Sequence, residues 1–113
     1  MPLIEIFALP QPDPGVVPRV LDALVEEVAA AVGARPEGVW VVWHDVEPGA
    51  YAAGPSRPDV QPRDSHPPLV RVFVNRPPDA TERALEAIER VIARELGLGD
   101  ATPFVIVDQR HEG

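Results

Sequence analysis

The sequence contains no cysteine and no lysine, and each absence removes a class of chemistry. Without cysteine the chain forms no disulfide, no zinc ribbon and no thiol nucleophile. All 10 of its basic residues are arginine, which excludes Schiff-base chemistry on a lysine side chain. Ser56 and Ser65 are the only serines, and neither lies in a nucleophile-elbow sequence. Covalent catalysis by any of these groups is therefore not expected.

Long hydrophobic runs and positive charge are also scarce. No apolar run approaches the roughly 18 residues that span a bilayer, and no basic region precedes an apolar one at the N-terminus. Ten basic residues against 18 acidic ones give a net charge of −8, whereas phosphate binding needs a basic field. The sequence predicts a soluble cytoplasmic protein without a membrane or nucleic-acid partner.

What is present suits one folded domain spanning residues 1–113. A hydrophobic fraction of 45% with 25% charged residues argues against disorder. Periodicity predicts four strands, at residues 3–9, 39–46, 69–75 and 103–108. It also predicts two helices, at residues 17–32 and 85–96, each followed by glycine. The predicted order is therefore β-α-β, then a proline-rich linker over residues 48–67, then β-α-β.

The two halves form an internal repeat, with pseudo-repeats at residues 2–47 and 68–108. Phe7 matches Phe73 at an offset of 66, and Leu21 matches Leu85 at an offset of 64. A crossover helix requires the two strands of each unit to be parallel. The sequence thus predicts an α/β (α+β) fold in which two tandem β-α-β units form a four-stranded mixed sheet with both helices on one face.

Alternation along the strands assigns the two faces of this sheet. The even positions, such as Ile4 and Val72, are small and apolar and suit the helix-covered face. The odd positions are mixed but too apolar for water, so other subunits are expected to cover them. Glu5 and Arg71, at equivalent odd positions, are expected to form a structural ion pair there.

Pro2 follows the initiator methionine directly and opens the first strand. Methionine is normally removed before a small residue, which would leave Pro2 with a secondary amine at the N-terminus. Such an amine is a workable general base when burial or a nearby guanidinium lowers its pKa toward neutrality. Pro2 is therefore a candidate catalytic residue.

The segment Pro2-Leu-Ile-Glu-Ile-Phe, the doubled β-α-β layout and the chain length together resemble the tautomerase superfamily. The resemblance implies a homotrimer in which the sheets form a barrel and the helices lie outside. It implies a keto–enol tautomerase (an isomerase) that acts on a small enolisable keto acid, with Pro2 as general base and no cofactor.

The resemblance also implies roles for individual residues. Asn75-Arg76-Pro77-Pro78 is similar to the Arg-Pro-Arg segment of malonate semialdehyde decarboxylases, so Arg76 would hold the substrate carboxylate. Arg35-Pro36 is similar to a carboxylate-binding Lys-Pro, which makes Arg35 a second candidate. Three aromatic residues would bind the substrate and exclude water: Trp40, Tyr51 within Gly49–Gly54, and Phe104.

Two alternatives remain open. The first is a decarboxylase, hydratase or dehalogenase acting on a three-carbon acid, although Pro78 stands where the second arginine of the decarboxylases falls. The second is a non-catalytic trimer with a binding or assembly role. A metal site is not expected, because His44, His66 and His111 are scattered without ligand spacing.

Overall fold

The chain is organised as two β-α-β units in a computed structural model, which describes residues 2–109. The first unit consists of β1 (Leu3–Ala8), α1 (Val16–Val32) and β2 (Trp40–Asp45). The second consists of β3 (Leu69–Val74), α2 (Pro78–Leu96) and β4 (Phe104–Gln109). A short 3₁₀ turn, η1 (Pro36–Gly38), lies between α1 and β2. The predicted order is confirmed, and η1 is an addition that periodicity does not reveal.

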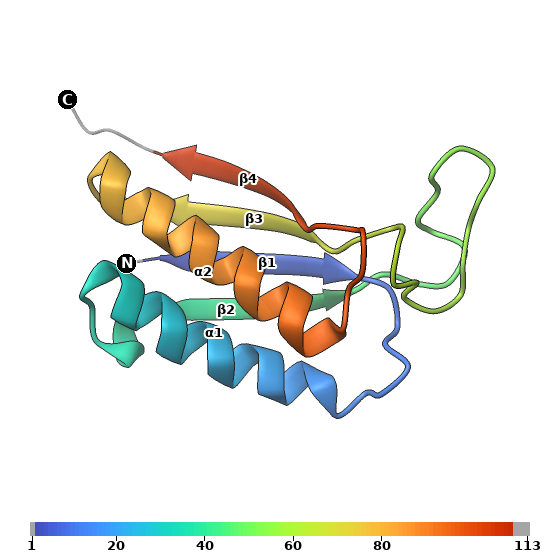
Figure 1. Ribbon diagram of the computed structural model, residues 1–113, viewed down its shortest axis with the longest axis horizontal. Helices are drawn as coiled ribbons and strands as arrows, with labels where there is room; N and C mark the ends of the chain where they lie inside the picture. The colour runs from blue at the N-terminus through green and yellow to red at the C-terminus, as the bar shows by residue number, and fades with distance from the viewer. Residues whose placement is uncertain (1, 110–113) are drawn as a thin grey trace.

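The four strands form one mixed sheet in the order β2-β1-β3-β4 (Figure 1). Within each unit the strands are parallel, and the units join through the antiparallel pair β1–β3. The starts of β1 and β2 therefore lie at the same end of the sheet as the ends of β3 and β4. We call this the Pro2 end; the opposite end, where the connection over residues 46–68 lies, is the loop end (Figure 1).

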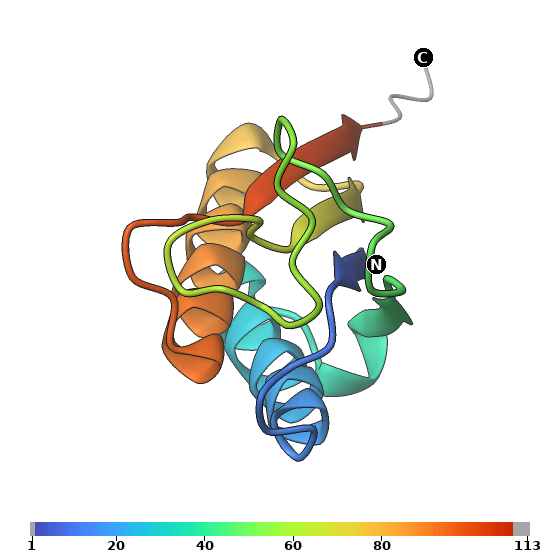
Figure 2. The same ribbon diagram turned by 90° about the vertical axis from the view of Figure 1, so that its right-hand side faces the viewer.

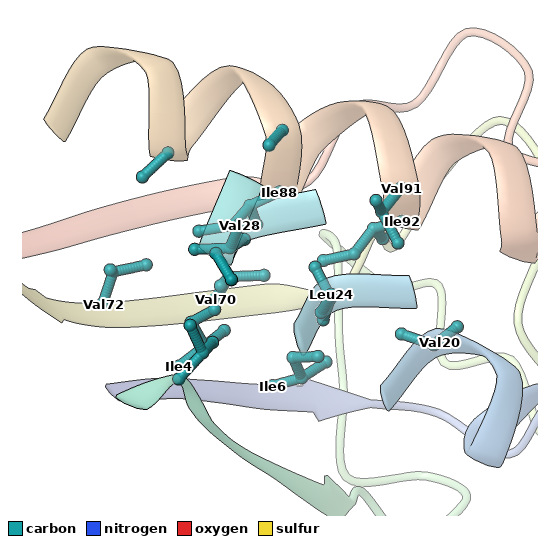
Figure 3. Packing of buried hydrophobic residues seen from close by; sticks show 14 of the residues in the cluster. Ile4, Ile6, Val20, Leu24, Val28, Val70, Val72, Ile88, Val91 and Ile92 are labelled. Atoms are coloured by element: carbon teal, nitrogen blue, oxygen red, sulfur yellow. The ribbon is translucent and has the colours of Figure 1, made fainter. Parts of the chain in front are cut away.

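Both helices pack on one face of the sheet, as the sequence predicts (Figure 2). The even-numbered side chains of β1 and β3 are buried beneath them. Figure 3 shows isoleucines and valines of these strands meeting the apolar stripes of α1 and α2. The fully buried members of this core include Ile4, Ile6, Val20, Leu24, Val28, Val70, Val72, Ile88, Val91 and Ile92.

The ends of the helices are set by glycine and proline. Gly33 and Gly97 adopt left-handed φ angles of 68° and 64°, which a glycine reaches without steric cost. Their amides donate to the carbonyls of the last helical turns and so close α1 and α2. Pro78 occupies the first turn of α2, where no amide donor is needed. No helix within residues 2–109 is long and apolar enough to cross a bilayer.

The other face of the sheet carries no helix (Figure 2). It is rich in exposed apolar side chains. Isolated exposed apolar residues are normal, but a continuous patch of them marks an interaction surface. Five large apolar residues of β2, β3 and β4 contribute to this bare face: Trp40, Val42, Leu69, Phe104 and Ile106.

Candidate functional site

A surface pocket of about 750 Å³ lies at the Pro2 end of the sheet. One wall is the continuous segment 34–38, which includes η1 and leads into β2. The other wall is Arg76, which follows β3. The antiparallel β1–β3 pair makes this meeting possible, because it places the end of β3 beside the start of β1. The pocket thus unites the two arginines that the sequence singles out.

Arg76 has a hydrogen-bond donor that the described chain leaves unused. Its side chain is half-buried, and its Nε atom is buried without a hydrogen-bond partner among residues 2–109. The Arg76 backbone is held by the Thr81 hydroxyl, which donates to the Arg76 carbonyl at 3.3 Å. A buried donor without a partner is costly, so this position favours an acceptor oxygen supplied from outside the chain.

Arg35 is exposed and immediately precedes η1. Within residues 2–109 it takes part in no ion pair. A guanidinium offers a planar fork of donors that matches the two oxygens of a carboxylate. Arg35 and Arg76 therefore give the pocket the character of an anion site.

Glu37 also lines the pocket, and sequence reasoning missed it. It is exposed and lies two residues after Arg35, within η1. The sequence held one general indication, which is that Glu37 is only two residues from the candidate cation Arg35. Without η1, however, nothing indicated that the Glu37 side chain would line the same pocket.

Pro2 lies at the same end of the sheet but is not among the pocket-lining residues. Its side chain is fully buried, and its carbonyl accepts a hydrogen bond from the Trp40 amide at 3.0 Å. The residue after it, Leu3, pairs with Phe73, three residues before Arg76. The structure thus brings Pro2 and Arg76 to neighbouring strands, with Pro2 beneath the surface.

Trp40 begins β2 on the bare face, with 56% of its surface exposed. It is two residues from Gly38, the last residue of the pocket wall. Trp43 points to the opposite face and packs against the core beneath the helices. Trp40 is therefore the exposed tryptophan at this end of the sheet, and its contact with a substrate stays a prediction.

Within a single chain, Tyr51 and Pro2 lie at opposite ends of the sheet. Tyr51 belongs to the connection at the loop end (Figure 1), where its hydroxyl donates to the Pro67 carbonyl at 2.8 Å. Its ring lies edge-on to His66 at 5.0 Å between ring centres. Partial burial raises the pKa of the Tyr51 phenol. In a single chain Tyr51 is thus a loop-packing residue.

Phe104 also lies away from the pocket. It begins β4 at the loop end and is 60% exposed on the bare face. Its partner in the sheet is Leu69, the first residue of β3. One chain therefore brings together Pro2, Arg35, Trp40 and Arg76, and leaves Tyr51 and Phe104 at the other end.

The polar residues of the bare face make different contacts from those expected. Glu5 and Arg71 are directly opposite each other in the β1–β3 register. In the structure, however, Glu5 Oε1 lies 3.6 Å from His44 Nε2. Arg71 instead lies over the Phe73 ring, 4.9 Å from its centre. The expected Glu5–Arg71 ion pair is therefore wrong for the single chain, although the two residues are paired in the sheet register.

Metal ligands do not gather within residues 2–109. No group of three or more histidine, aspartate or glutamate side chains is placed to hold an ion in that range. His44 lies on the bare face and His66 in the connection, while His111 lies outside the described residues.

No protein-family model matches the sequence, and no curated protein matches it. Solved structures do match. Native fused 4-OT gives a TM-score of 0.79 at 16% identity, covering 96% of this chain and 86% of that one. Malonate semialdehyde decarboxylase gives 0.71 at 15% identity, covering 96% and 84%. Macrophage migration inhibitory factor of Toxoplasma gondii gives 0.65 at 16% identity, covering 96% and 89%.

These similarities span nearly the whole chain, and at such low identity they show the fold alone. The chain has the fold of the tautomerase superfamily, so the resemblance carried by the sequence is confirmed at the level of architecture. Among the similar structures, fused 4-OT is described both as an asymmetric and as a symmetric trimer.

Proposed function

We propose that the protein is a keto–enol tautomerase that acts on a small enolisable keto acid. The observation that carries this proposal is the unpartnered Nε of Arg76, in a pocket that also holds Arg35, at the sheet end where Pro2 begins β1. The arginines would bind the carboxylate through paired hydrogen bonds. Pro2 would supply the base once Met1 has been removed.

The reaction needs one base and one cation. The Pro2 nitrogen takes the proton of the enol hydroxyl, which leaves an enolate with its negative charge on the oxygen. The C=C electrons then take that proton back from Pro2 at the adjacent carbon as the C–O bond becomes a carbonyl, so the enzyme returns to its starting state. Arg76 stabilises the enolate oxygen charge between the two steps. In the processed chain, an apolar surrounding would disfavour the protonated form of the free Pro2 amine and so favour its role as a base.

Further copies of the chain would complete the site. We propose that the exposed apolar side chains of the bare face are covered in a trimer; fused 4-OT, to which the chain is similar, is a trimer. Tyr51 and Phe104 would then serve the pocket of a neighbouring copy, where they would exclude water. Light scattering coupled to size exclusion measures the mass of the assembly.

The test of the function begins with the intact mass of protein whose N-terminus carries no tag. A mass lacking one methionine leaves a free Pro2 amine, and phenylenolpyruvate ketonisation, followed by ultraviolet absorbance, should then be fast in the wild type. Pro2→Ala is the control and should be slower by about a hundredfold or more. A processed wild type with no activity above this variant would overturn the proposal.

The complete burial of Pro2 favours a second candidate, a non-catalytic trimer that binds carboxylates. In that case Met1 would be retained, or Pro2→Ala would leave ligand binding and turnover unchanged. Malonate semialdehyde turnover tests the remaining alternative, decarboxylation or hydration of a three-carbon acid. Its product is detected separately from that of ketonisation.

A further inference from the structure

The pocket at the Pro2 end holds two positive charges and one negative charge. Arg35 and Arg76 are the cations and Glu37 is the anion, while the remaining lining residues carry no charge. The formal charge of the lining side chains is therefore +1. A ligand with one carboxylate neutralises this charge, whereas a ligand with two carboxylates leaves the occupied pocket with a net negative charge.

The Glu37 charge is not already neutralised by a neighbour. Within residues 2–109, Glu37 forms no ion pair with Arg35, with Arg76 or with any other residue. Its carboxylate therefore acts on whatever enters the pocket. Two like charges a few ångströms apart repel each other, most strongly where the protein excludes water.

From this charge balance we infer that Glu37 is a specificity residue that restricts the pocket to monoanionic carboxylates and rejects dicarboxylates. The inference rests on the proposed function, since it assumes that Arg35 and Arg76 bind a substrate carboxylate. Discrimination of this kind depends on a repulsive element as much as on an attractive one. Arg35 and Arg76 provide the attraction, and Glu37 provides the repulsion.

Crotonate and fumarate are matched probes, because they share a trans four-carbon skeleton and differ in one methyl group against one carboxylate. Their dissociation constants can be measured by ¹⁵N–¹H correlation spectra, following the Gly38 amide in the pocket wall. The wild type should bind crotonate more tightly than fumarate. Glu37→Gln should lower the dissociation constant of fumarate relative to that of crotonate by about threefold to tenfold. Added salt should reduce this change.

Two control variants separate a local charge effect from other causes. Glu37→Asp keeps the charge and should keep the wild-type preference. Glu89→Gln removes one negative charge from the exposed surface of α2, outside the pocket, and should leave the ratio unchanged. A ratio that moves equally in Glu37→Gln and Glu89→Gln would overturn the inference.

Failure of the inference and failure of the proposed function give different results. If both probes shift Gly38 and the wild type ketonises phenylenolpyruvate, but Glu37→Gln leaves the ratio unchanged, only the role of Glu37 is wrong. If neither probe perturbs the pocket in any variant and no turnover occurs, the proposed function is wrong and the inference falls with it.

Discussion

The Pro2 end and the loop end of the sheet share a backbone plan but carry different charges. At the Pro2 end, the Pro2 carbonyl accepts a hydrogen bond from the Trp40 amide at 3.0 Å. At the loop end, the Pro68 carbonyl accepts the equivalent bond from the Phe104 amide at 3.1 Å. These pairs occupy matching positions in the two β-α-β units. The fold therefore builds the same local geometry twice.

The pocket lined by Arg35 and Arg76 lies at the Pro2 end. By the offsets of the repeat, Arg35 corresponds to Gly99 and Arg76 corresponds to Pro10. Neither Gly99 nor Pro10 carries a charge, so the repeat does not reproduce the two pocket-lining arginines at the loop end; the arginine beside Gly99 is Arg63, which donates to the Gly97 carbonyl. In the proposed function, the chemistry would thus depend on a few residues that follow α1 and β3, and not on the architecture that holds them.

The largest expected effect is on stability, and it tests whether the two β-α-β units contribute equally to the hydrophobic core. Leu24 and Ile88 are equivalent positions of α1 and α2, and both are 0% exposed. Leu24→Ala and Ile88→Ala should each lower the free energy of unfolding by about 2–5 kcal/mol, because each opens a cavity. Urea unfolding at one fixed protein concentration measures this change. A value below about 1 kcal/mol at either position would show that the units do not contribute alike.

The next effect concerns the cations. Arg76→Ala should lower kcat/KM for ketonisation by about a hundredfold or more, because the developing negative charge loses its donor. Arg76→Lys should recover part of the rate, since it restores charge without the fork. Pro10→Ala, at the matching position of the loop end, should have no effect on kcat/KM. Equal losses in Arg76→Ala and Pro10→Ala would place the site elsewhere.

The bare face offers a matched pair on its two outer strands. Val42 in β2 and Ile106 in β4 are equivalent in the repeat, and they are 42% and 65% exposed. Val42→Asp and Ile106→Asp should each weaken assembly by at least about tenfold, because a buried unpaired charge is costly. Light scattering measures the mass, and circular dichroism should show that the fold is retained. Assemblies of unchanged mass would exclude this face as the interface.

The smallest effect is a pH dependence at the contact between the helices. Hydrogen bonding by Arg94, with a further contribution from Arg90, holds the pKa of Glu27 below its usual value. The ion pair therefore stabilises the fold above the unfolded-state pKa of about 4.3, and this stabilisation is lost as the pH falls through the lower folded-state value.

Glu27→Gln tests this dependence. The variant should melt slightly below the wild type at pH 7, and the difference should vanish in acid. Glu26→Gln is the matched control, because Glu26 is exposed and has no ion pair within residues 2–109. A difference in melting temperature between wild type and Glu27→Gln that grows as the pH falls would contradict the expected direction of the pH dependence.

Much of the fold could be predicted because periodicity reports directly on burial. Alternation along β1 and β3 identified the helix-covered face, and the repeat identified two equivalent units. The start of α2 was less visible. Ala80 and Ala84 pack in its first turns, and such small residues add little to an apolar stripe that begins at Leu85. Strand and helix order could be read from the sequence, and this boundary could not.

The site was harder to predict, for reasons that differ between residues. The strand register places Glu5 opposite Arg71. A long charged side chain can reach several neighbours, however, and the Glu5 carboxylate contacts His44. Spacing along the chain also does not say at which end of a sheet Tyr51 will lie. Pocket residues such as Glu37 depend on a three-residue turn that leaves no periodic signal.

The connection over residues 46–68 has a consequence for symmetry. If the two β-α-β units were separate identical chains related by a two-fold axis, any arginine placed at one end of the sheet would also stand at the other. Joining the units covalently removes that constraint, because each half can then change by itself. The repeat makes Arg76 equivalent to Pro10. Two equivalent positions can carry different residues only when the two units differ in sequence. The covalent connection therefore lets Arg76 stand at one end of the sheet without a counterpart at the other.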